Sequence, residues 1–278
     1  MRIAVLSGKG GTGKTFVSVN LACAAEHAVY ADCDIEEPDG QLFFKPQPMT
    51  SIPVTVPVPE FSAGSCSGCH KCTDLCAWHA LACVKNKIIV FEEMCHSCGG
   101  CILVCPEKAL RERDKNIGTV DEGVSDSVRF FSGCLNTGEV SGVPVIKALT
   151  RRLPEDGTVI IDCPPGSACS VMESIRSASF CVLVAEPTVF GVQNLETVYE
   201  LVTLFGKKCG VVINKNINGR NPAESFCKKH HIPVLVRIPF EASLGRLNSE
   251  GRIAVREKDS YRDLFRKLLT QIQQEAQK

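Results

Sequence analysis

A glycine-rich stretch near the start of the chain, GKGGTGKT at residues 8–15, restricts the possible folds more than any other feature. It fits the pattern G-x-x-x-x-G-K-[ST] and lies between an apolar run at 2–6 and a helical pattern at 14–26. A buried strand, a glycine-rich turn and a helix in this order form a phosphate-binding loop, because backbone N–H groups and the helix N-terminus surround the phosphate oxygens. The stretch therefore predicts a strand–loop–helix unit that binds the phosphates of a nucleotide.

The residue types of this loop have separate roles. Glycines let the backbone curl around phosphate oxygens. The ammonium group of Lys14 is expected to neutralise the β and γ phosphates, and the hydroxyl of Thr15 is expected to bind Mg²⁺. Contacts with the nucleotide are expected from the whole loop: Gly8, Lys9, Gly10, Gly11, Thr12, Gly13, Lys14 and Thr15.

Short apolar runs and helical patterns alternate through most of the remaining chain. This alternation predicts parallel strands with helices on both faces. Residues 46–65 contain five prolines, which indicates a linker or edge segment rather than a helix. We therefore expect an α/β fold with a doubly wound, mostly parallel sheet, interrupted by a small cysteine-rich module. The further strand candidates are 28–32, 128–133, 158–163, 180–186, 209–214 and 233–239.

Charge and hydropathy argue against several classes of protein. Basic and acidic residues balance at 31 each, so no strong field favours nucleic acid, and no nucleic-acid partner is expected. No run of about 18 apolar residues occurs, so no integral membrane segment is expected. The first residues do not form a secretory signal of the usual kind. We therefore expect a cytoplasmic protein in a reducing compartment.

The last residues, 260–278, carry apolar side chains at helical spacing. Such a stripe predicts a terminal helix that packs on the core. The alternative is a helix that lies on a membrane surface, but its polar face is rich in glutamine rather than in lysine and arginine.

Eight of the seventeen cysteines form two runs, CSGCHKCTDLC at 66–76 and CHSCGGCILVCP at 95–106. Both read C-x₂-C-x₂-C-x₃-C, the spacing of bacterial ferredoxins with two [4Fe–4S] clusters, in which the fourth cysteine of each run ligates the other cluster. Ala77 stands where this pattern has a proline after the first run. The pattern assigns Cys66, Cys69, Cys72 and Cys105 to cluster 1, and Cys95, Cys98, Cys101 and Cys76 to cluster 2.

Zinc is the alternative ligand for such cysteines. Four-coordinate zinc sites usually combine two C-x₂-C pairs, whereas each run here has four cysteines, so the spacing favours clusters. We expect a discontinuous nucleotide-binding domain, 1–61 and 111–278, and a ferredoxin-like α+β insert, 62–110.

The glycine-rich loop also has a second lysine, Lys9. The stretch KGGTGKT resembles the deviant Walker A loop of the MinD/ParA/Mrp family of P-loop ATPases, to which the nitrogenase iron protein is related. The resemblance implies that Lys9 reaches across a dimer interface to the partner's ATP. It therefore implies an ATP-dependent homodimer, or a heterodimer with a paralogue.

Further stretches extend the resemblance over most of the chain outside the insert. ADCD places Asp34 where the family has the acid that orients the attacking water. VIIDCPPG resembles the Walker B and switch segment, in which Asp162 would hold Mg²⁺ through water and Gly166 would sense the γ-phosphate. VVINK makes Asn214 the candidate for recognition of the adenine. Asp32 lies next to these groups, and two roles are possible for it: contact with the nucleotide, or capping of a helix.

The resemblance implies a slow, switch-like ATPase whose catalytic groups are Lys9, Lys14 and Asp34. Together with the cysteines, it suggests an ATPase that gates electron transfer through two [4Fe–4S] clusters to a redox partner. The main alternative is an ATPase that assembles or carries iron–sulfur or other metal clusters for a protein partner. Two further readings are an ATPase that positions a complex in the cell, and clusters with a purely structural role.

Overall fold

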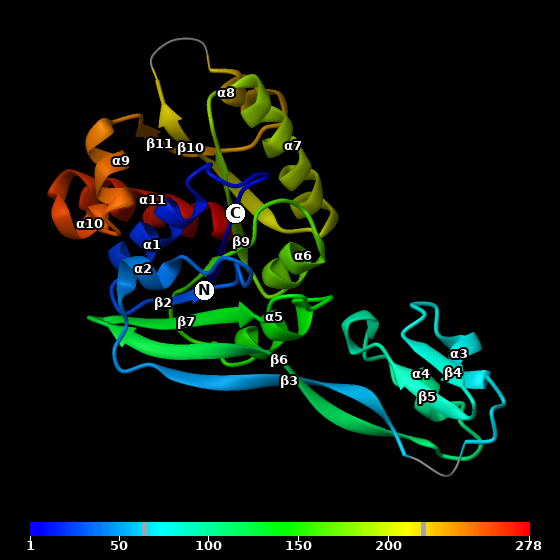
Figure 1. The fold of residues 1–278 in the computed structure, drawn as a ribbon. Coiled ribbons are helices and arrows are strands. Elements are labelled where there is room, and N and C mark those ends of the chain that lie inside the picture. Colours follow the sequence, from blue (N-terminus) through cyan, green and yellow to red (C-terminus); the bar gives the residue numbers. More distant parts are fainter. Residues whose placement is uncertain (63–65, 218–220) are drawn as a thin grey trace.

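The structure, a computed structural model, describes residues 1–62, 66–217 and 221–278. A nine-stranded sheet with the order β11-β10-β9-β1-β8-β2-β7-β6-β3 crosses the molecule (Figure 1). Its strands are β1 (Arg2–Leu6), β2 (Val29–Asp32), β3 (Thr50–Phe61), β6 (Leu110–Ser125), β7 (Val128–Leu135), β8 (Val159–Asp162), β9 (Phe180–Ala185), β10 (Lys208–Asn216) and β11 (Val234–Pro239).

Seven of these strands run parallel, from β11 to β7, while β6 and β3 are antiparallel to their neighbours. The central strands are continuous apolar runs because helices cover both of their faces. Because these strands are parallel, the loops that follow β1, β2, β8 and β10 lie at the same edge of the sheet. The polar residues of these loops are therefore close to one another. The predicted α/β fold with a mostly parallel sheet is confirmed.

Two apolar cores lie on the two faces of this sheet. On one face pack α5 (Val143–Thr150), α6 (Cys169–Ile175), α7 (Val189–Leu204) and α8 (Pro222–Lys229). On the other pack α1 (Lys14–Ala24), α2 (Gly40–Phe44), α9 (Ala242–Ser249), α10 (Ala254–Glu257) and α11 (Asp259–Gln277).

The C-terminal helix α11 belongs to the second core. Its side chains of Phe265, Leu268 and Ile272 are fully buried, and the helix contacts α1, β10 and β11. The prediction of a terminal helix that packs on the core is confirmed. Within the described ranges, we find no helix with the length and apolarity needed to cross a membrane.

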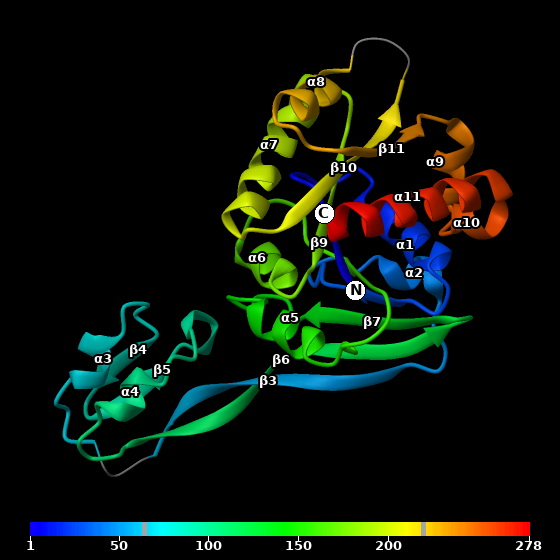
Figure 2. The same cartoon turned by 180° about the vertical axis from the view of Figure 1, so that it is seen from behind.

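Strands β3 and β6 form a two-stranded ribbon that leaves the sheet and ends at a small cysteine-rich unit (Figures 1 and 2). The ribbon pairs Thr50 with Glu122 at one end and Phe61 with Leu110 at the other. Strand β6 pairs with β7 only from Gly118 onward, so its residues 110–117 extend beyond the main sheet. In both views the ribbon is the path by which the chain enters and leaves the small unit.

The small unit has its own antiparallel hairpin, β4 (Leu81–Val84) and β5 (Lys87–Val90). The two-residue turn between them places Lys85 and Asn86 at positive φ, the conformation that matches the twist of a hairpin. Three short helical segments complete the unit: α3 (Lys71–Leu75), η1 (Glu92–Met94) and α4 (Gly100–Leu103). The hairpin thus lies between the two cysteine runs in the chain.

Candidate functional site

The glycine-rich loop connects β1 to α1, as predicted, and two of its glycines are required by their surroundings. A Cβ on Gly8 would lie 2.2 Å from the backbone oxygen of Asn194 in α7. Gly13 adopts a φ of 94°, and a Cβ there would lie 2.1 Å from Nδ2 of Asn214. The loop is therefore in close contact with the start of α7 and the end of β10.

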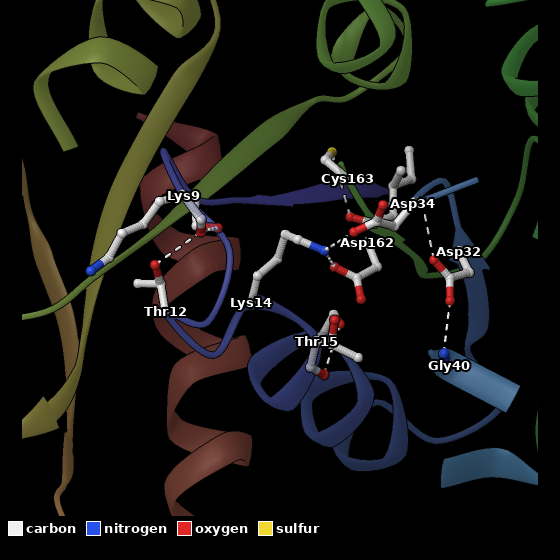
Figure 3. Close-up of polar contacts among 12 residues, drawn as sticks. Lys9, Thr12, Lys14, Thr15, Asp32, Asp34, Gly40, Asp162 and Cys163 are labelled. Carbon is white, nitrogen blue, oxygen red and sulfur yellow. Dashed lines mark hydrogen bonds and ion pairs between the residues drawn. The ribbon is translucent and has the colours of Figure 1, made fainter. Parts of the chain in front are cut away.

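Lys14 lies at the centre of the site, buried between two carboxylates (Figure 3). Its Nζ donates to Oδ1 of Asp162 at 2.8 Å and to Oδ2 of Asp34 at 3.4 Å. Burial alone lowers the pKa of Lys14, but the carboxylates of Asp162 and then Asp34 outweigh it, so the net pKa is raised. Lys14 is therefore a cation in this site at neutral pH.

Asp32 has a supporting position. Its Oδ2 accepts from the backbone N–H of Gly40 at 2.8 Å, and its Oδ1 accepts from that of Asp34 at 3.1 Å (Figure 3). Gly40 is the first residue of α2, so the carboxylate ties the start of this helix to the loop that carries Asp34. Burial, followed by the neighbouring Asp162, raises the pKa of Asp32 well above its usual value. This geometry favours the cap-like role over direct contact with a nucleotide.

Lys9 extends away from Lys14 (Figure 3). Its Nζ lies 3.1 Å from Oε2 of Glu186, and Lys215 contacts the other oxygen of the same carboxylate at 2.7 Å. Lys215 also donates to the backbone oxygen of Gly11 at 2.8 Å. Lys9 is thus held within its own chain, through a carboxylate that is 13% exposed.

The switch segment after β8 lies against the glycine-rich loop. The N–H of Gly166 donates to the backbone oxygen of Ser7 at 2.9 Å, and Gly166 has a φ of 88°. Asp162 is fully buried at the end of β8. Thr15 lies in the first turn of α1, next to Lys14 (Figure 3). The structure thus brings the predicted phosphate and Mg²⁺ groups to one edge of the sheet.

A cavity of about 620 Å³, counting the space open to solvent, lies beside the loop. Asn214 lines it, and its Nδ2 donates to the backbone oxygen of Thr12 at 2.8 Å. Most of the cavity's other lining residues were not predicted from the sequence. The available signal was the strand end at 239, which lies at the same edge of the sheet as the loop. These residues include Phe16, Lys215, Pro239, Phe240, Glu241 and Leu244.

The eight cysteines of the two runs surround two cavities in the small unit. One cavity is lined by Cys66, Cys69, Cys72 and Cys105, and the other by Cys76, Cys95, Cys98 and Cys101. Each cavity thus takes three cysteines from one run and the fourth from the other run. None of these eight cysteines forms a disulfide bond.

The two runs repeat one backbone conformation, with an offset of 29 residues. The N–H of Gly68 donates to Sγ of Cys66 at 3.4 Å, and that of Ser97 donates to Sγ of Cys95 at 3.5 Å. Gly68 and Ser97 both have positive φ. The sulfurs of the fourth cysteines also accept from backbone N–H groups: Ala80 to Cys76 at 3.4 Å and Ala109 to Cys105 at 3.2 Å.

In the part of the chain that the structure describes, no three His, Cys, Asp or Glu side chains converge closely enough to share a single metal ion.

The chain is similar to known proteins over most of its length. The chain is 28% identical to the uncharacterized protein MJ0578 of Methanocaldococcus jannaschii over 275 residues, which cover 96% of each protein. It is similar in fold to the cell division ATPase MinD of Pyrococcus furiosus, with a TM-score of 0.59, 18% identity and 98% of both chains covered. The septum site-determining protein MinD of Pyrococcus horikoshii, in complex with Mg-ADP, has a TM-score of 0.56 and 19% identity, over 96% of this chain and 93% of that one.

Residues 3–255 match the family of the CobQ/CobB/MinD/ParA nucleotide binding domain. This range includes the phosphate loop, Asp32 and Asp162 at the ends of β2 and β8, and the cysteine module. The chain therefore belongs to the CobQ/CobB/MinD/ParA family of nucleotide-binding P-loop ATPases.

Proposed function

We propose that this protein is a slow, switch-like ATPase that carries two [4Fe–4S] clusters and couples its nucleotide state to electron transfer with a redox partner. We further propose the division into an ATPase domain, 1–61 with 111–278, and a ferredoxin-like insert, 62–110. The observation that carries the proposal is the pair of cavities, because each is lined by the four cysteines that the ferredoxin pattern assigns to one cluster.

The donor set fits a cluster better than a single ion. One zinc ion needs its thiolates to converge on a point, at about 2.3 Å each. In a [4Fe–4S] cube each thiolate binds a different iron, so the four sulfurs surround a volume. Thiolates around a cavity, with backbone N–H groups donating to some of them, match that arrangement. When bound, the clusters would supply one-electron redox chemistry.

In the ATPase domain, Lys14 would bind the β and γ phosphates, and Thr15 with Asp162 would hold Mg²⁺, which Asp162 contacts through water. Asp34 would orient the attacking water, and Asn214 would bind the adenine in the cavity that it lines. Positioned charge supplies most of the catalysis in phosphoryl transfer. The solved complex of a similar fold with Mg-ADP supports the assignment of nucleotide and Mg²⁺.

A path of contacts connects the nucleotide edge to the ribbon. Ile35 directly follows Asp34, is buried, and accepts at its backbone oxygen from the N–H of Leu135 at 2.9 Å. The next residue, Asn136, donates to the backbone oxygen of Ile117 at 2.9 Å. Ile117 lies at the point where β6 leaves the main sheet. A nucleotide-dependent movement at Asp34 would therefore reach the root of the ribbon.

The path continues along the ribbon by ion pairs. Lys115 contacts Glu139 at 2.9 Å, in the loop that follows Asn136. Lys115 also donates to the backbone oxygen of Glu92, whose carboxylate pairs with Arg113. Glu92 begins the 3₁₀ turn that leads into Cys95. These contacts connect the nucleotide domain to the cavity of cluster 2, which supports gating of electron transfer over clusters with a purely structural role.

We also propose that ATP drives formation of a homodimer, or of a heterodimer with a paralogue, in which Lys9 reaches the partner's nucleotide. Lys9 is 42% exposed and is paired with Glu186 in the single chain. It therefore has to leave Glu186 before it contacts a second nucleotide.

A positioning ATPase is the second candidate, because the similar solved structures include cell division ATPases. Among the described residues, however, the one long amphipathic C-terminal helix buries its apolar side against the core. An ATPase that assembles or carries clusters remains the other alternative. A labile cluster normally has incomplete ligation, and each cavity here has four cysteines.

The test is anaerobic EPR of the reduced protein, with the potentials of both clusters titrated with and without ATP·Mg²⁺. Two [4Fe–4S] signals and a nucleotide-dependent shift of either potential are expected. The Lys14→Ala variant is the control, since it should keep both signals and lose the shift. Two clusters with unchanged potentials would overturn gating, whereas stoichiometric zinc without iron would overturn the iron–sulfur assignment.

A further inference from the structure

We propose that Tyr30 is a positioning residue of the ATPase site: its hydroxyl holds the Asp162 carboxylate in the orientation that binds Mg²⁺. This inference rests on the proposed role of Asp162 as a Mg²⁺ group that acts through water. It is independent of the cysteine module.

The geometry is direct. The hydroxyl of Tyr30 donates to Oδ2 of Asp162 at 2.9 Å, while Oδ1 of the same carboxylate accepts from Lys14 at 2.8 Å. Tyr30 and Asp162 are both fully buried. One carboxylate is thus held from two sides, by a group of β2 and by the lysine of the phosphate loop. A buried tyrosine hydroxyl ordinarily needs a polar partner, and in this structure that partner is a predicted Mg²⁺ residue.

The two contacts of Asp162 have different fates when a nucleotide binds. Lys14 is needed at the β and γ phosphates, so it has to release Oδ1 of Asp162, and that oxygen becomes free for a Mg²⁺-bound water. Tyr30 has no role at the phosphates and keeps Oδ2. Its hydrogen bond therefore persists in both states and prevents rotation of the buried carboxylate when the lysine leaves.

The surroundings of Tyr30 keep its ring in place. The ring lies 5.7 Å from that of Phe130, nearly parallel to it, and 4.8 Å from that of Phe44. A Cβ on Gly40 would lie 2.5 Å from Cε1 of Tyr30, so the backbone of α2 covers the ring closely. This packing fixes the direction in which the hydroxyl of Tyr30 points.

The test is the Tyr30→Phe variant, which keeps the ring and removes the hydroxyl. We expect Mn²⁺, used as a spectroscopic substitute for Mg²⁺, to bind the ADP complex about tenfold more weakly by EPR, the lower end for loss of a group that orients a metal-binding residue. The Mg²⁺ concentration for half-maximal ATP hydrolysis should rise by the same factor, with a much smaller change in ADP affinity without metal. Tyr199→Phe is the matched control, because that ring packs on Phe226 and His230 in α8 and its C-cap.

A double-mutant cycle separates positioning from packing. If Tyr30 acts through Asp162, Tyr30→Phe should have no further effect on Mn²⁺ binding in the Asp162→Asn background. Unchanged Mn²⁺ binding in Tyr30→Phe, or an equal effect in both backgrounds, would overturn the inference. Failure of the wild-type protein to bind Mn²⁺·ADP would instead overturn the proposed nucleotide site, so the two failures are distinguishable.

Discussion

The nucleotide edge and the cysteine module are held together in different ways. At the nucleotide edge, buried side chains such as Lys14 and Asp162 already contact one another, and two large apolar cores support them. Among the described residues of the module, the cluster of buried apolar side chains that pack on one another has four members: Cys72, Leu81, Ile88 and Leu110. A unit this small rarely folds on apolar burial alone and usually needs a metal or disulfides. The first site is therefore organised by the fold, whereas the second has little apolar support and would depend on the clusters that we propose for its cysteines.

The largest effect is expected from removal of the iron of the two proposed clusters. Chelation should unfold the module and leave the ATPase core intact, because binding of metal by cysteines supplies folding energy in small units. The chain has a single tryptophan, Trp78, which lies in the module and stacks on His96 with ring centroids 3.7 Å apart. In urea, Trp78 fluorescence should lose its cooperative transition after chelation, while circular dichroism should keep that of the core. Coincident transitions by both probes in the iron-free protein would show that the module folds with the core and without metal.

The second effect concerns the nucleotide edge alone. Lys14→Ala removes the cation between two carboxylates and leaves Asp162 buried without it. Breaking a buried pair from one side costs about 3 kcal/mol. In urea titrations, we expect the free energy of unfolding of the nucleotide-free core to fall by about 3 kcal/mol. The absorbance of the proposed clusters should not change. Lys147→Ala, at an exposed position of α5, is the control; loss of clusters in Lys14→Ala alone would show that the two regions are not separate.

A smaller effect is expected at Glu186, where the fold holds Lys9 back. Glu186→Gln should free Lys9 and tighten ATP-dependent dimerisation about threefold, as for a partly exposed ion pair. Sedimentation with a non-hydrolysable ATP analogue measures this. A weaker dimer in the variant would mean that Glu186 assists the interface instead.

The same pair has a defined pH dependence. Burial by itself raises the pKa of Glu186, but hydrogen bonds from Lys215 and Lys9 outweigh it, so the net pKa lies below the usual 4.5. A depressed pKa means that the pair contributes stability at neutral pH and loses it as the pH falls through the lowered value. The difference in the free energy of unfolding between wild type and Glu186→Gln should therefore vanish at acid pH and persist from about pH 5 upward. A difference that varies near neutrality would contradict this assignment.

The smallest effect on stability is expected at the junction of the two regions. Glu92→Gln breaks an exposed pair with Arg113 and should change the free energy of unfolding by less than about 1 kcal/mol. It should nevertheless reduce the nucleotide-dependent shift of the cluster potentials, because Glu92 connects the ribbon to the turn before Cys95. Glu93→Gln is the control, at an exposed neighbouring position. An undiminished shift in Glu92→Gln would remove this contact from the proposed path.

Local patterns predicted much of this molecule. The phosphate loop, the parallel strands and the grouping of the cysteines follow from short stretches whose chemistry requires fixed spacing. The long strand β6 was missed, because LRERDKNIGTVDEGVS is mostly polar and its outer half pairs with the proline-rich β3 rather than entering a core. Prolines in β3 are tolerated because it is an edge strand.

Side-chain partners at the nucleotide edge could not be predicted in the same way. Tyr30, Glu186 and Lys215 reach the site from three different strand ends, and each contact depends on how those strands are ordered in the sheet. The hydroxyl of Tyr30, in a short buried strand whose other polar residue is Asp32, was the local sign of a buried partner.

The length of the ribbon determines what kind of signal can travel along it. Eight residues of β6, 110–117, extend beyond the main sheet, which corresponds to about 26 Å of extended strand. The Debye length at physiological ionic strength is about 8 Å. Charges at opposite ends of the ribbon are therefore screened from one another, but the small unit also touches the ribbon near its root, where Lys115 donates to the backbone oxygen of Glu92. An influence of ATP on cluster 2 would therefore pass through this contact rather than along the outer part of the strands.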